Sequence, residues 1–480
     1  MLNFRKTSLR MMNNMIKEEV KVSVVGLDAL SWPYLSKLMD KGVIPHIKAV
    51  ISKSYKYVLK CFPPTTPPSW SSILTGVNPG KHGIFGFDYI VYDSLVQKLY
   101  TAMNLEHPRI HEMLSMLNFK SIVINPMPGY PIIPAKGAKI LSHTILIPKP
   151  QFSPKSMEKY ANILAKIIRV EPLRSCSETL NYYDEYLSLL NEIVEKLVYD
   201  EWSLFWINLP IPDIILHKCE HDVFSKTLTL EAKVFSKVDK IIKTLSQMSD
   251  TISLISDHGF SYYKTLIRIN DILAKKGLLK TIGRRKEAAL KEYREVKAEF
   301  AGKHLEVNRT FVDKFSSKAF YISKWNLGVH VNDFNALPKV LELLNSVKGI
   351  LWAKRRDEVY WGPYVKRAPH IIIRPWFEGG YLQADNKVKG VIYEEGLFKD
   401  HHPDGVFTVK TSSLKLLDHI EIPNYVVTPL IMCLMNMPLS NITDGIEILE
   451  KLFIEEKPKI TFKNYIPKWK VLKKLAKVRV

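Results

Sequence analysis

The chain has 480 residues, of which 46% are hydrophobic and 24% are charged. These are globular values, and the chain is long enough to bury a large core. The formal net charge is +21. This charge is compatible with an anionic substrate, nucleic acid, a membrane surface or the general surface chemistry of the source organism, and it does not choose among them.

Four cysteines are scattered along the chain and no CxxC pair occurs. Their spacing indicates neither a zinc finger nor a disulfide framework, so we expect four buried thiols in a reducing compartment. The first residues lack the apolar region of a signal peptide, and no stretch reaches the ~18 apolar residues that cross a bilayer. We therefore predict a cytoplasmic protein.

The elements alternate between buried strands and helices. The apolar, β-branched run 20–26 predicts a first strand, and a helix follows over about 33–41. Further strands are predicted in FKSIVINP (119–126), EWSLFWINLPIPD (201–213) and DTISLISDHGF (250–260). Helices are predicted over 106–118, over 155–199 in pieces, and over 225–247. This alternation predicts an α/β fold with a mainly parallel sheet.

Three of these strands end at or near an aspartate: Asp28, Asp213 and Asp257. Functional groups of open parallel sheets gather at the carboxyl ends of the strands. We therefore expect the three carboxylates to share a site along one edge of the sheet.

The later part of the chain changes character. Residues 275–310 form a charged, helix-favouring run, which we interpret as a solvated helical insertion, with a cationic lid as the alternative. Short strands are expected in KAFYIS and HIIIRP. Residues 457–480 carry nine Lys or Arg and no acid. Trp469 and Leu472 are spaced for one helical face there, which fits a solvated or core-docked helix or a surface for anionic lipid or nucleic acid.

Histidines and carboxylates occur in pairs that could bind metal ions. The motif DIILH places Asp213 and His217 four residues apart, on one face of a helical turn. SDHG and DHHPDG add further histidines beside turns. No GxGxxG or GxSxG occurs, which excludes a dinucleotide fingerprint and a nucleophile elbow. The nitrogen and oxygen donors suffice for two divalent cations and come from Asp28, Asp213, His217, Asp257, His258 and the loop that contains His401, His402 and Asp404.

The order of these motifs carries more information than any one of them. Six motifs follow one another along the chain: an Asp after the first strand, threonines in PPTTPP, TG…P…HG, DxxxH, SDHG and the late HHPDG loop. This order resembles the alkaline phosphatase superfamily, in the branch of type I phosphodiesterases and nucleotide pyrophosphatases. The resemblance covers roughly 20–450 and is strongest to microbial members described as predicted phosphohydrolases or phosphomutases.

The resemblance implies a fold and a division of the chain. The expected fold is a three-layer α/β/α sandwich with a mainly parallel central sheet and a helical or mixed insertion. The expected division is a tail (1–19), a first core part (20–280), an insertion or cap (281–370), a second core part (371–456) and a basic tail (457–480).

The resemblance also implies a nucleophile. In this family it lies nine residues before the Thr of the TG pair, which is Thr75 here, so Thr66 is the nucleophile and Thr65 a structural neighbour. The run PPSWSSIL can start a helix with Pro in its first turn. Thr66 would then be the N-cap, where backbone N–H groups and the helix dipole favour an anionic oxygen.

The same resemblance implies which residues bind the metal ions. One metal would be held by Asp28, Thr66, Asp257 and His258, and the other by Asp213, His217 and His401. Two such ions clamp the attacking and leaving oxygens while a phospho-threonine forms and is hydrolysed. Histidine with carboxylate suits Zn²⁺ or Mn²⁺ better than Mg²⁺.

The sequence departs from the family at a few positions. Ser69 stands where many members have an Asn that holds a phosphoryl oxygen, and His370 stands where an Asp is usual. The Arg of phosphomonoesterase relatives is not identifiable. His402 takes the variable place in its loop and could meet the leaving group. These changes leave the substrate open.

We therefore predict a two-metal phosphoric-ester hydrolase acting on a small phosphate ester, such as a phosphodiester or nucleotide, with no obligate protein partner. Phosphomonoesterase, phosphomutase, or sulfate- or phosphonate-ester activity is the alternative on the same site. A basic nucleic-acid or membrane-surface binder on a degenerate hydrolase fold is the non-enzyme alternative.

Overall fold

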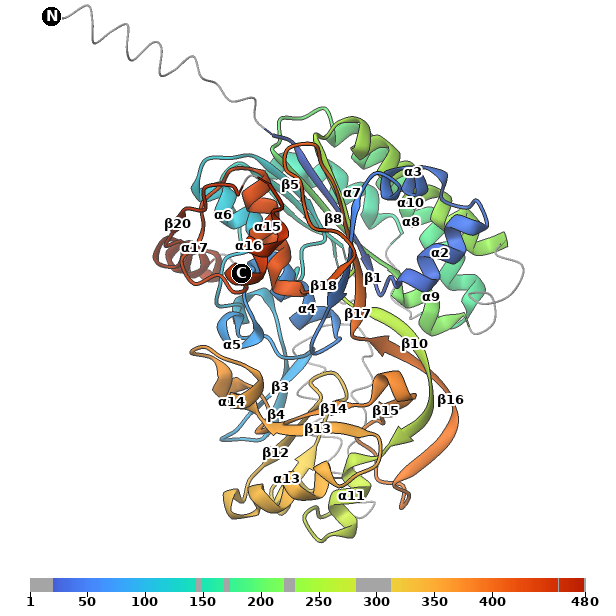
Figure 1. The fold of residues 1–480 in the computed structure, drawn as a ribbon, viewed down its shortest axis with the longest axis vertical. Helices are drawn as coiled ribbons and strands as arrows, with labels where there is room; N and C mark the ends of the chain where they lie inside the picture. Colours follow the sequence, from blue (N-terminus) through green and yellow to red (C-terminus); the bar gives the residue numbers. More distant parts are fainter. Residues whose placement is uncertain are drawn as a thin grey trace, which may run out of the picture.

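A nine-stranded sheet forms the centre of the protein (Figure 1). The computed structural model describes residues 20–143, 149–167, 173–219, 229–281, 312–455 and 457–478. In spatial order the strands are β18 (Ile420–Pro423), β2 (Tyr55–Lys60), β17 (Asp404–Lys410), β9 (Thr251–Ile255), β1 (Val22–Asp28), β8 (Leu204–Pro212), β5 (Ser121–Ile124), β6 (Ala138–Ser142) and β7 (Gln151–Ser153). Strands β9, β1, β8, β5 and β6 are parallel neighbours, while β17 and β7 run antiparallel to theirs. The predicted, mainly parallel sheet is confirmed.

Helices cover both faces of this sheet, because its central strands are apolar on both sides. Every residue of β1 is buried, with Val25 and Leu27 facing one core and Val22 and Val24 the other. The first face carries α2 (Trp32–Asp40), α3 (Pro45–Ile51), α7 (Glu158–Ala165), α8 (Cys176–Leu197), α9 (Asp213–Lys218) and α10 (Thr229–Gln247). The second carries α4 (Thr66–Thr75), α6 (Ile110–Met116), α15 (Val427–Leu434), α16 (Ile446–Leu452) and α17 (Ile466–Val478). The three-layer α/β/α sandwich is confirmed.

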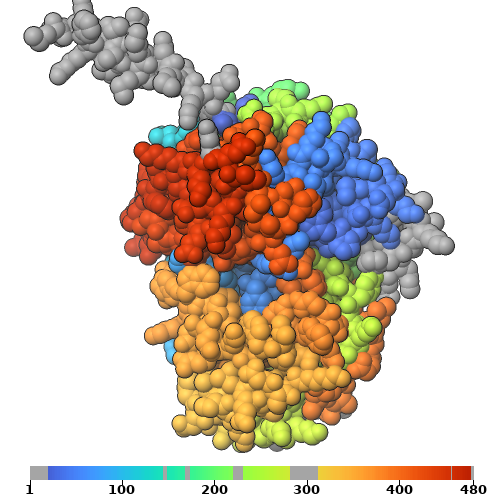
Figure 2. Space-filling model, in the orientation of Figure 1, coloured from blue at the N-terminus to red at the C-terminus, as the bar shows by residue number. Residues whose placement is uncertain are grey.

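A second body, which we call the cap, has its own hydrophobic core. Its antiparallel sheet runs β11 (Ala319–Tyr321), β12 (Gly328–Val331), β14 (Ile371–Pro375) and β13 (Ile350–Arg355). The hairpin β3 (Asp88–Val91) and β4 (Val96–Leu99) belongs to it, as do α11 (Ile269–Lys275), α13 (Leu337–Asn345) and α14 (Arg356–Val359). Figure 2 shows the cap, largely yellow and orange, packed directly against the core.

A long antiparallel pair joins cap and core. Strand β10 (Gly259–Ile267) pairs with β16 (Tyr393–His402), and β15 (Tyr381–Gln383) adds to its far end. In Figure 1 this pair curves along one side of the molecule, from the core sheet to the cap. Strands β11 and β14 confirm the predicted KAFYIS and HIIIRP strands. The predicted charged helix over 275–310 falls largely on 282–311, outside the described residues, and the division of the chain at 280, 370 and 456 stays a prediction.

The basic C-terminal segment ends in a helix that packs on the core. Trp469 of α17 is fully buried, and its Nε1 donates to Glu112 Oε2 at 3.0 Å. Lys473 lies 3.7 Å from Glu106. The short parallel pair β19 (Leu439–Ser440) and β20 (Phe462–Lys463) holds the preceding chain. The core-docked helix is therefore observed, because Trp469 fills the core beside α6, while a surface for anionic lipid or nucleic acid stays a prediction.

The expectation of four free thiols is wrong for one pair. Cys176 and Cys219 form a disulfide across 43 residues of chain, while Cys61 and Cys433 are free and buried. The spacing of the cysteines does not predict this bond, because the bond requires the start of α8 and the residue after α9 to lie side by side. Among the described helices, none is both long and apolar enough to cross a membrane.

Candidate active site

Three aspartates meet at the carboxyl edge of the central sheet. Asp28 ends β1, Asp257 follows β9, and Asp213 begins α9 directly after β8. Strands β9, β1 and β8 are adjacent and parallel, so their ends lie together. The predicted gathering of carboxylates along one edge is confirmed.

The first group of side chains surrounds His258. Its Nε2 lies 3.4 Å from Asp28 Oδ1, 3.4 Å from Asp257 Oδ2 and 3.4 Å from Thr66 Oγ1. All four residues are buried. The structure thus brings together the four residues predicted for one metal. We call Asp28, Thr66, Asp257 and His258 the first group.

The second group lies beside the first and consists of Asp213, His217 and His401. Asp213 Oδ1 is 3.3 Å from the Nε2 atom of each histidine, and the two Nε2 atoms are 3.2 Å apart. Helix α9 places Asp213 and His217 one turn apart, and His401 comes from β16. The rings of His258 and His401 stack with centroids 3.9 Å apart, which joins the two groups.

Backbone carbonyls orient two of the histidines. His258 Nδ1 lies 3.0 Å from Gly259 O, and His401 Nδ1 lies 2.9 Å from Pro64 O. A carbonyl oxygen only accepts, so each Nδ1 carries a proton, and in the neutral form of the ring Nε2 then has the lone pair. Such a second hydrogen bond is typical of histidines that bind metals.

The residues fit divalent cations. The buried atoms Asp28 Oδ1, Asp213 Oδ1 and Asp257 Oδ2 have no hydrogen-bond partner among the described residues. Buried polar atoms are normally paired, but here the Asp28 and Asp257 oxygens lie 3.4 Å from His258 Nε2 and the Asp213 oxygen lies 3.3 Å from the Nε2 atoms of His217 and His401. Cations would satisfy them and offset their mutual repulsion. Carboxylate oxygens together with imidazole nitrogens form a donor set that suits Zn²⁺ or Mn²⁺.

Burial and neighbouring charges shift the pKa values in both groups. Burial, and then Asp257 and Asp213, raise the pKa of Asp28 well above its ordinary value. Burial raises the pKa of Asp257 to about 8. Burial and the neighbouring His401 lower the pKa of His258 to about 3. His258 is thus neutral, the form of histidine that binds metals.

The pKa of Asp213 moves in the opposite direction. Burial alone would raise it, but the neighbouring positive charges of His217 and His401 outweigh burial and hold the pKa of Asp213 well below its ordinary value. Asp213 is therefore the carboxylate that keeps its negative charge most readily in the cluster.

The two adjacent threonines face different partners. Thr65 Oγ1 donates to Trp325 O of the cap at 2.9 Å, whereas Thr66 Oγ1 faces His258. The predicted N-cap is wrong by one residue, because Thr65 is the N-cap and Thr66 is the first residue of α4. The prolines at 67 and 68 occupy the first turn, where a missing N–H costs no helix hydrogen bond.

Ser69 is engaged within the core. Its hydroxyl donates to Asp257 O and accepts from Asn424 Nδ2 at 2.9 Å. The single hydroxyl proton is therefore used, which argues against the predicted contact with a phosphoryl oxygen. Asn424 escaped the sequence reasoning because it lies 355 residues from Ser69 and belongs to no motif.

His402 lies outside both groups. Its Nδ1 accepts from Asp404 N at 3.2 Å, and its ring lies 6.3 Å from that of Phe377 in the cap. Neighbouring residues of a strand point to opposite sides, which separates His402 from His401. His370 lies within the cap, where its Nδ1 accepts from Val331 N at 2.9 Å.

A lysine of the cap also escaped the sequence reasoning. Lys324 pairs with Asp400, whose Oδ1 accepts from His401 N at 2.9 Å. No motif marks Lys324, because its ion pair with Asp400 forms only when the cap folds over the core.

The match to a protein family, together with the α/β/α fold, assigns the chain to the alkaline phosphatase superfamily. A model of the type I phosphodiesterase / nucleotide pyrophosphatase family matches residues 22–375. The chain belongs to this family. The family and the paired candidate metal sites support a phosphoric-ester hydrolase.

Solved structures share the fold at low sequence identity. Phosphonoacetate hydrolase from Sinorhizobium meliloti 1021, in complex with phosphonoformate, is 15% identical with a TM-score of 0.58, covering 85% of this chain and 94% of that one. Human ectonucleotide pyrophosphatase / phosphodiesterase 5 is 15% identical with a TM-score of 0.54, covering 90% and 99%. An inactive Thr-to-Ala variant of the murine protein, in complex with AMP, is 13% identical with a TM-score of 0.55, covering 91% and 100%. No curated protein matches the chain.

Proposed function

We propose that this protein is a two-metal phosphoric-ester hydrolase with Thr66 as nucleophile, acting on phosphodiesters or nucleotide pyrophosphates. The observation that carries the proposal is the convergence of Thr66 Oγ1 with His258 Nε2 at 3.4 Å, beside two buried carboxylates. Family membership supports the ester class. The murine relative, inactive as a Thr-to-Ala variant and solved with AMP, supports a threonine nucleophile and a nucleotide substrate.

Asp28, Thr66, Asp257 and His258 would hold one ion, and Asp213, His217 and His401 the other. When bound, divalent cations make a hydroxyl acidic enough to attack and neutralise charge on phosphoryl oxygens. Zn²⁺ or Mn²⁺ is the proposed metal, by the donor set.

Thr66 performs the covalent step. Its Oγ1 forms a bond to phosphorus, its hydroxyl proton passes to solvent, and the bond from phosphorus to the leaving oxygen breaks. Because α4 begins at Thr66, the positive end of the helix dipole faces the phosphoryl group. Pro67 and Pro68 lack N–H groups, which leaves the Thr66 N–H as the donor at this end. Water then forms a bond to phosphorus and gives up a proton, the bond from phosphorus to Thr66 Oγ1 breaks, and Oγ1 takes up a proton to restore the hydroxyl.

Other residues position this machinery. In the proposal Ser69 fixes the Asp257 backbone and thereby the first group, in place of the phosphoryl contact expected from sequence. The cytoplasmic location stays a prediction, and the Cys176–Cys219 disulfide argues against it, because disulfides are rare in reducing compartments.

A substrate screen tests the function. The purified protein is assayed with bis(p-nitrophenyl) phosphate, p-nitrophenyl phosphate, a dinucleotide pyrophosphate and a phosphonate ester, each with Mn²⁺, with Zn²⁺ or without added metal. We expect metal-dependent turnover that is fastest on a diester or pyrophosphate. A preference for the monoester or the phosphonate ester would favour the alternative activities of this site, and no turnover of any ester would contradict the proposal.

A further inference from the structure

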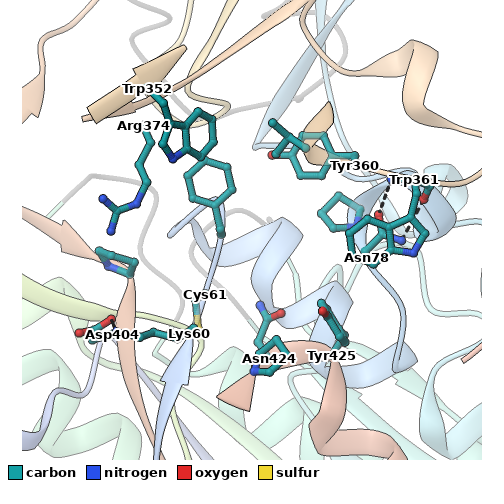
Figure 3. A pocket seen from close by; sticks show the side chains of 15 residues that line it. Lys60, Cys61, Asn78, Trp352, Tyr360, Trp361, Arg374, Asp404, Asn424 and Tyr425 are labelled. Atoms are coloured by element: carbon teal, nitrogen blue, oxygen red, sulfur yellow. Dashed lines mark hydrogen bonds and ion pairs between the residues drawn. The ribbon is translucent and has the colours of Figure 1, made fainter. Parts of the chain in front are cut away.

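The cationic side chains in the cavity between cap and core are already paired. This cavity has a volume of about 430 Å³, and in Figure 3 Lys60 and Asp404 lie on its core side and Arg374 on its cap side. Lys60 Nζ lies 2.8 Å from Asp404 Oδ1, and Arg374 pairs with Glu378. Both cations therefore have partners, whereas the lysines of the C-terminal helix α17 differ in this respect.

Helix α17 has two apolar faces, of which one packs on the core. The packed face includes Trp469 and Ala476, which are 0% and 4% exposed. On the opposite face Val471 and Leu475 lie one turn apart and are 58% and 59% exposed. Pro467, also exposed, extends this row by one more turn. The core thus occupies the face that carries Trp469, while a second apolar row faces solvent.

Lysines flank the exposed row on both sides. With about 3.6 residues per turn, Lys470 and Lys474 lie along one side of the row and Lys468 along the other. All three are exposed, and none forms an ion pair among the described residues. Lys473, by contrast, is turned toward the core and lies 3.7 Å from Glu106. The outward lysines therefore carry positive charge that no described acidic side chain offsets.

The chain around α17 adds to this charge. Residues 457–480 hold nine Lys or Arg and no acid, and the exposed Phe462 and Lys463 precede the helix. Helices α17 and α9 cover opposite faces of the central sheet, and Figure 1 shows them on opposite sides of the molecule. The outward face of α17 is therefore separate from the candidate ligands. We call it the α17 surface, and it consists of Pro467, Lys468, Lys470, Val471, Lys474 and Leu475.

This pattern fits one kind of partner best. An apolar row with lysines around it is typical of helices that lie on an anionic bilayer, with the apolar side chains among the headgroups and the ammonium groups at the level of the phosphates. Nucleic acid would leave Val471 and Leu475 unused, because its contacts come from cationic, hydroxyl and amide side chains. A second copy of the chain would bring the lysines of the two helices against each other across a two-fold axis, which repulsion disfavours.

We propose that the α17 surface is a docking site for the anionic headgroups of a phospholipid bilayer. Trp469 holds the other face of α17 in the core, so the helix is already folded and little conformational entropy is lost on binding. Each outward lysine contributes about fivefold to the affinity near an anionic surface. This site goes beyond the proposed hydrolase activity and does not rest on it.

Co-sedimentation of the full-length protein with vesicles tests the α17 surface. The vesicles contain phosphatidylglycerol with phosphatidylcholine, or phosphatidylcholine alone. We expect binding to the anionic vesicles only, and added salt should weaken it. The variant Lys468→Gln, Lys470→Gln, Lys474→Gln should bind about a hundredfold more weakly, at about fivefold per lysine. The variant Val471→Gln, Leu475→Gln keeps the charge, removes the apolar row and should bind about tenfold more weakly.

A matched control removes the same charge elsewhere. The variant Lys233→Gln, Lys240→Gln, Lys243→Gln changes exposed positions of α10, on the opposite face of the central sheet. It should change vesicle binding by less than about twofold, because these positions lie far from the bound bilayer. All three variants change exposed side chains only, so their melting temperatures should match that of the wild type.

The other occupants are measured on the same proteins. Oligonucleotide binding, followed by fluorescence anisotropy, that depends on the α17 lysines in a protein that ignores anionic vesicles would assign the surface to nucleic acid and overturn the proposal. A dimer that sedimentation velocity finds in the wild type but not in Val471→Gln, Leu475→Gln, without vesicle binding, would assign it to a second copy and overturn it too. Equal loss of vesicle binding in the α17 and α10 lysine variants would show that only the net charge of +21 acts, which also contradicts the proposal. None of these outcomes depends on whether the protein hydrolyses phosphate esters.

Discussion

The two groups of candidate ligands differ in how deeply their side chains are buried. In the first group the side chains of Asp257 and His258 are 0% exposed and that of Asp28 is 11% exposed. In the second, the side chains of Asp213 and His217 are 16% and 33% exposed. The first group is therefore part of the interior of the core, whereas the second lies at its rim.

The helices and strands that carry the two groups also differ. The first group comes from the ends of two adjacent strands of the central sheet and the start of α4. The second depends on α9, a helix of six residues, and on β16, which runs to the cap. All four residues of the first group thus come from the core, with one contact to the cap through Thr65, while the second group also depends on a strand that runs to the cap and on short elements. We expect the two proposed ions to differ in affinity, with the first held more tightly.

The largest effect is expected at the nucleophile. Thr66→Ala should lower turnover by at least about a thousandfold, because it removes the hydroxyl that lies 3.4 Å from His258 Nε2 and is the proposed attacking group. The first group keeps three ligands, so the metal content should largely survive. Thr65→Ala removes only the hydrogen bond to Trp325 O and should stay within about tenfold of the wild type. If Thr65→Ala were inactive and Thr66→Ala active, the register of the nucleophile would be wrong.

The adjacent histidines give the next largest effect. His401→Ala should lose one of two bound metals and lower activity by orders of magnitude, since it removes one of three ligands of the second group. His402→Ala should keep both metals and change mainly KM, because His402 lies outside both groups. Elemental analysis of the two purified variants measures this difference. Two ions in His401→Ala and one in His402→Ala would reverse the assignment.

Graded chelation tests the proposed difference in affinity. The more exposed second group should lose its ion first, and the first group should lose its ion only at higher chelator concentration. Metal content and activity measured along the titration should show two steps, with activity lost in the first. A single step that removes both ions together would show that depth of burial does not rank the two groups.

A smaller effect is expected at the disulfide. Cys219 follows α9 directly, so its bond to Cys176 ties the end of the helix that carries Asp213 and His217 to α8. The double variant Cys176→Ser, Cys219→Ser should weaken metal binding by the second group about tenfold and leave the first unchanged. Cys433→Ala, at a free and buried thiol, is the control. Equal loss in both groups would mean that the disulfide stabilises the whole core rather than α9.

The sequence predicted the parts of the site that depend on local geometry. Asp28, Asp213 and Asp257 follow buried strands, and His217 lies one helical turn after Asp213, so short-range rules locate them. Contacts between distant segments were missed. The Ser69–Asn424 hydrogen bond, the Cys176–Cys219 disulfide and the pairing of Lys324 with Asp400 require elements far apart in sequence to meet. The proposed roles of these residues as metal ligands came from the order of the motifs and stay proposals; the fold brings the same residues together in two neighbouring groups.

The smallest effect on the site is expected from the C-terminal helix, which lies outside both groups. Trp469→Ala removes a fully buried ring and its hydrogen bond to Glu112, so it should lower the free energy of unfolding by about 3–5 kcal/mol. Val471→Ala on the same helix is the control, because Val471 is 58% exposed and should change stability little. Below its unfolding transition, the Trp469→Ala protein should keep both metals and the kcat of the wild type, since α17 contributes no ligand to either group. Denaturant unfolding and metal analysis of the same preparations measure both quantities. Loss of one metal from a folded Trp469→Ala protein would show that this face of the core also supports the site.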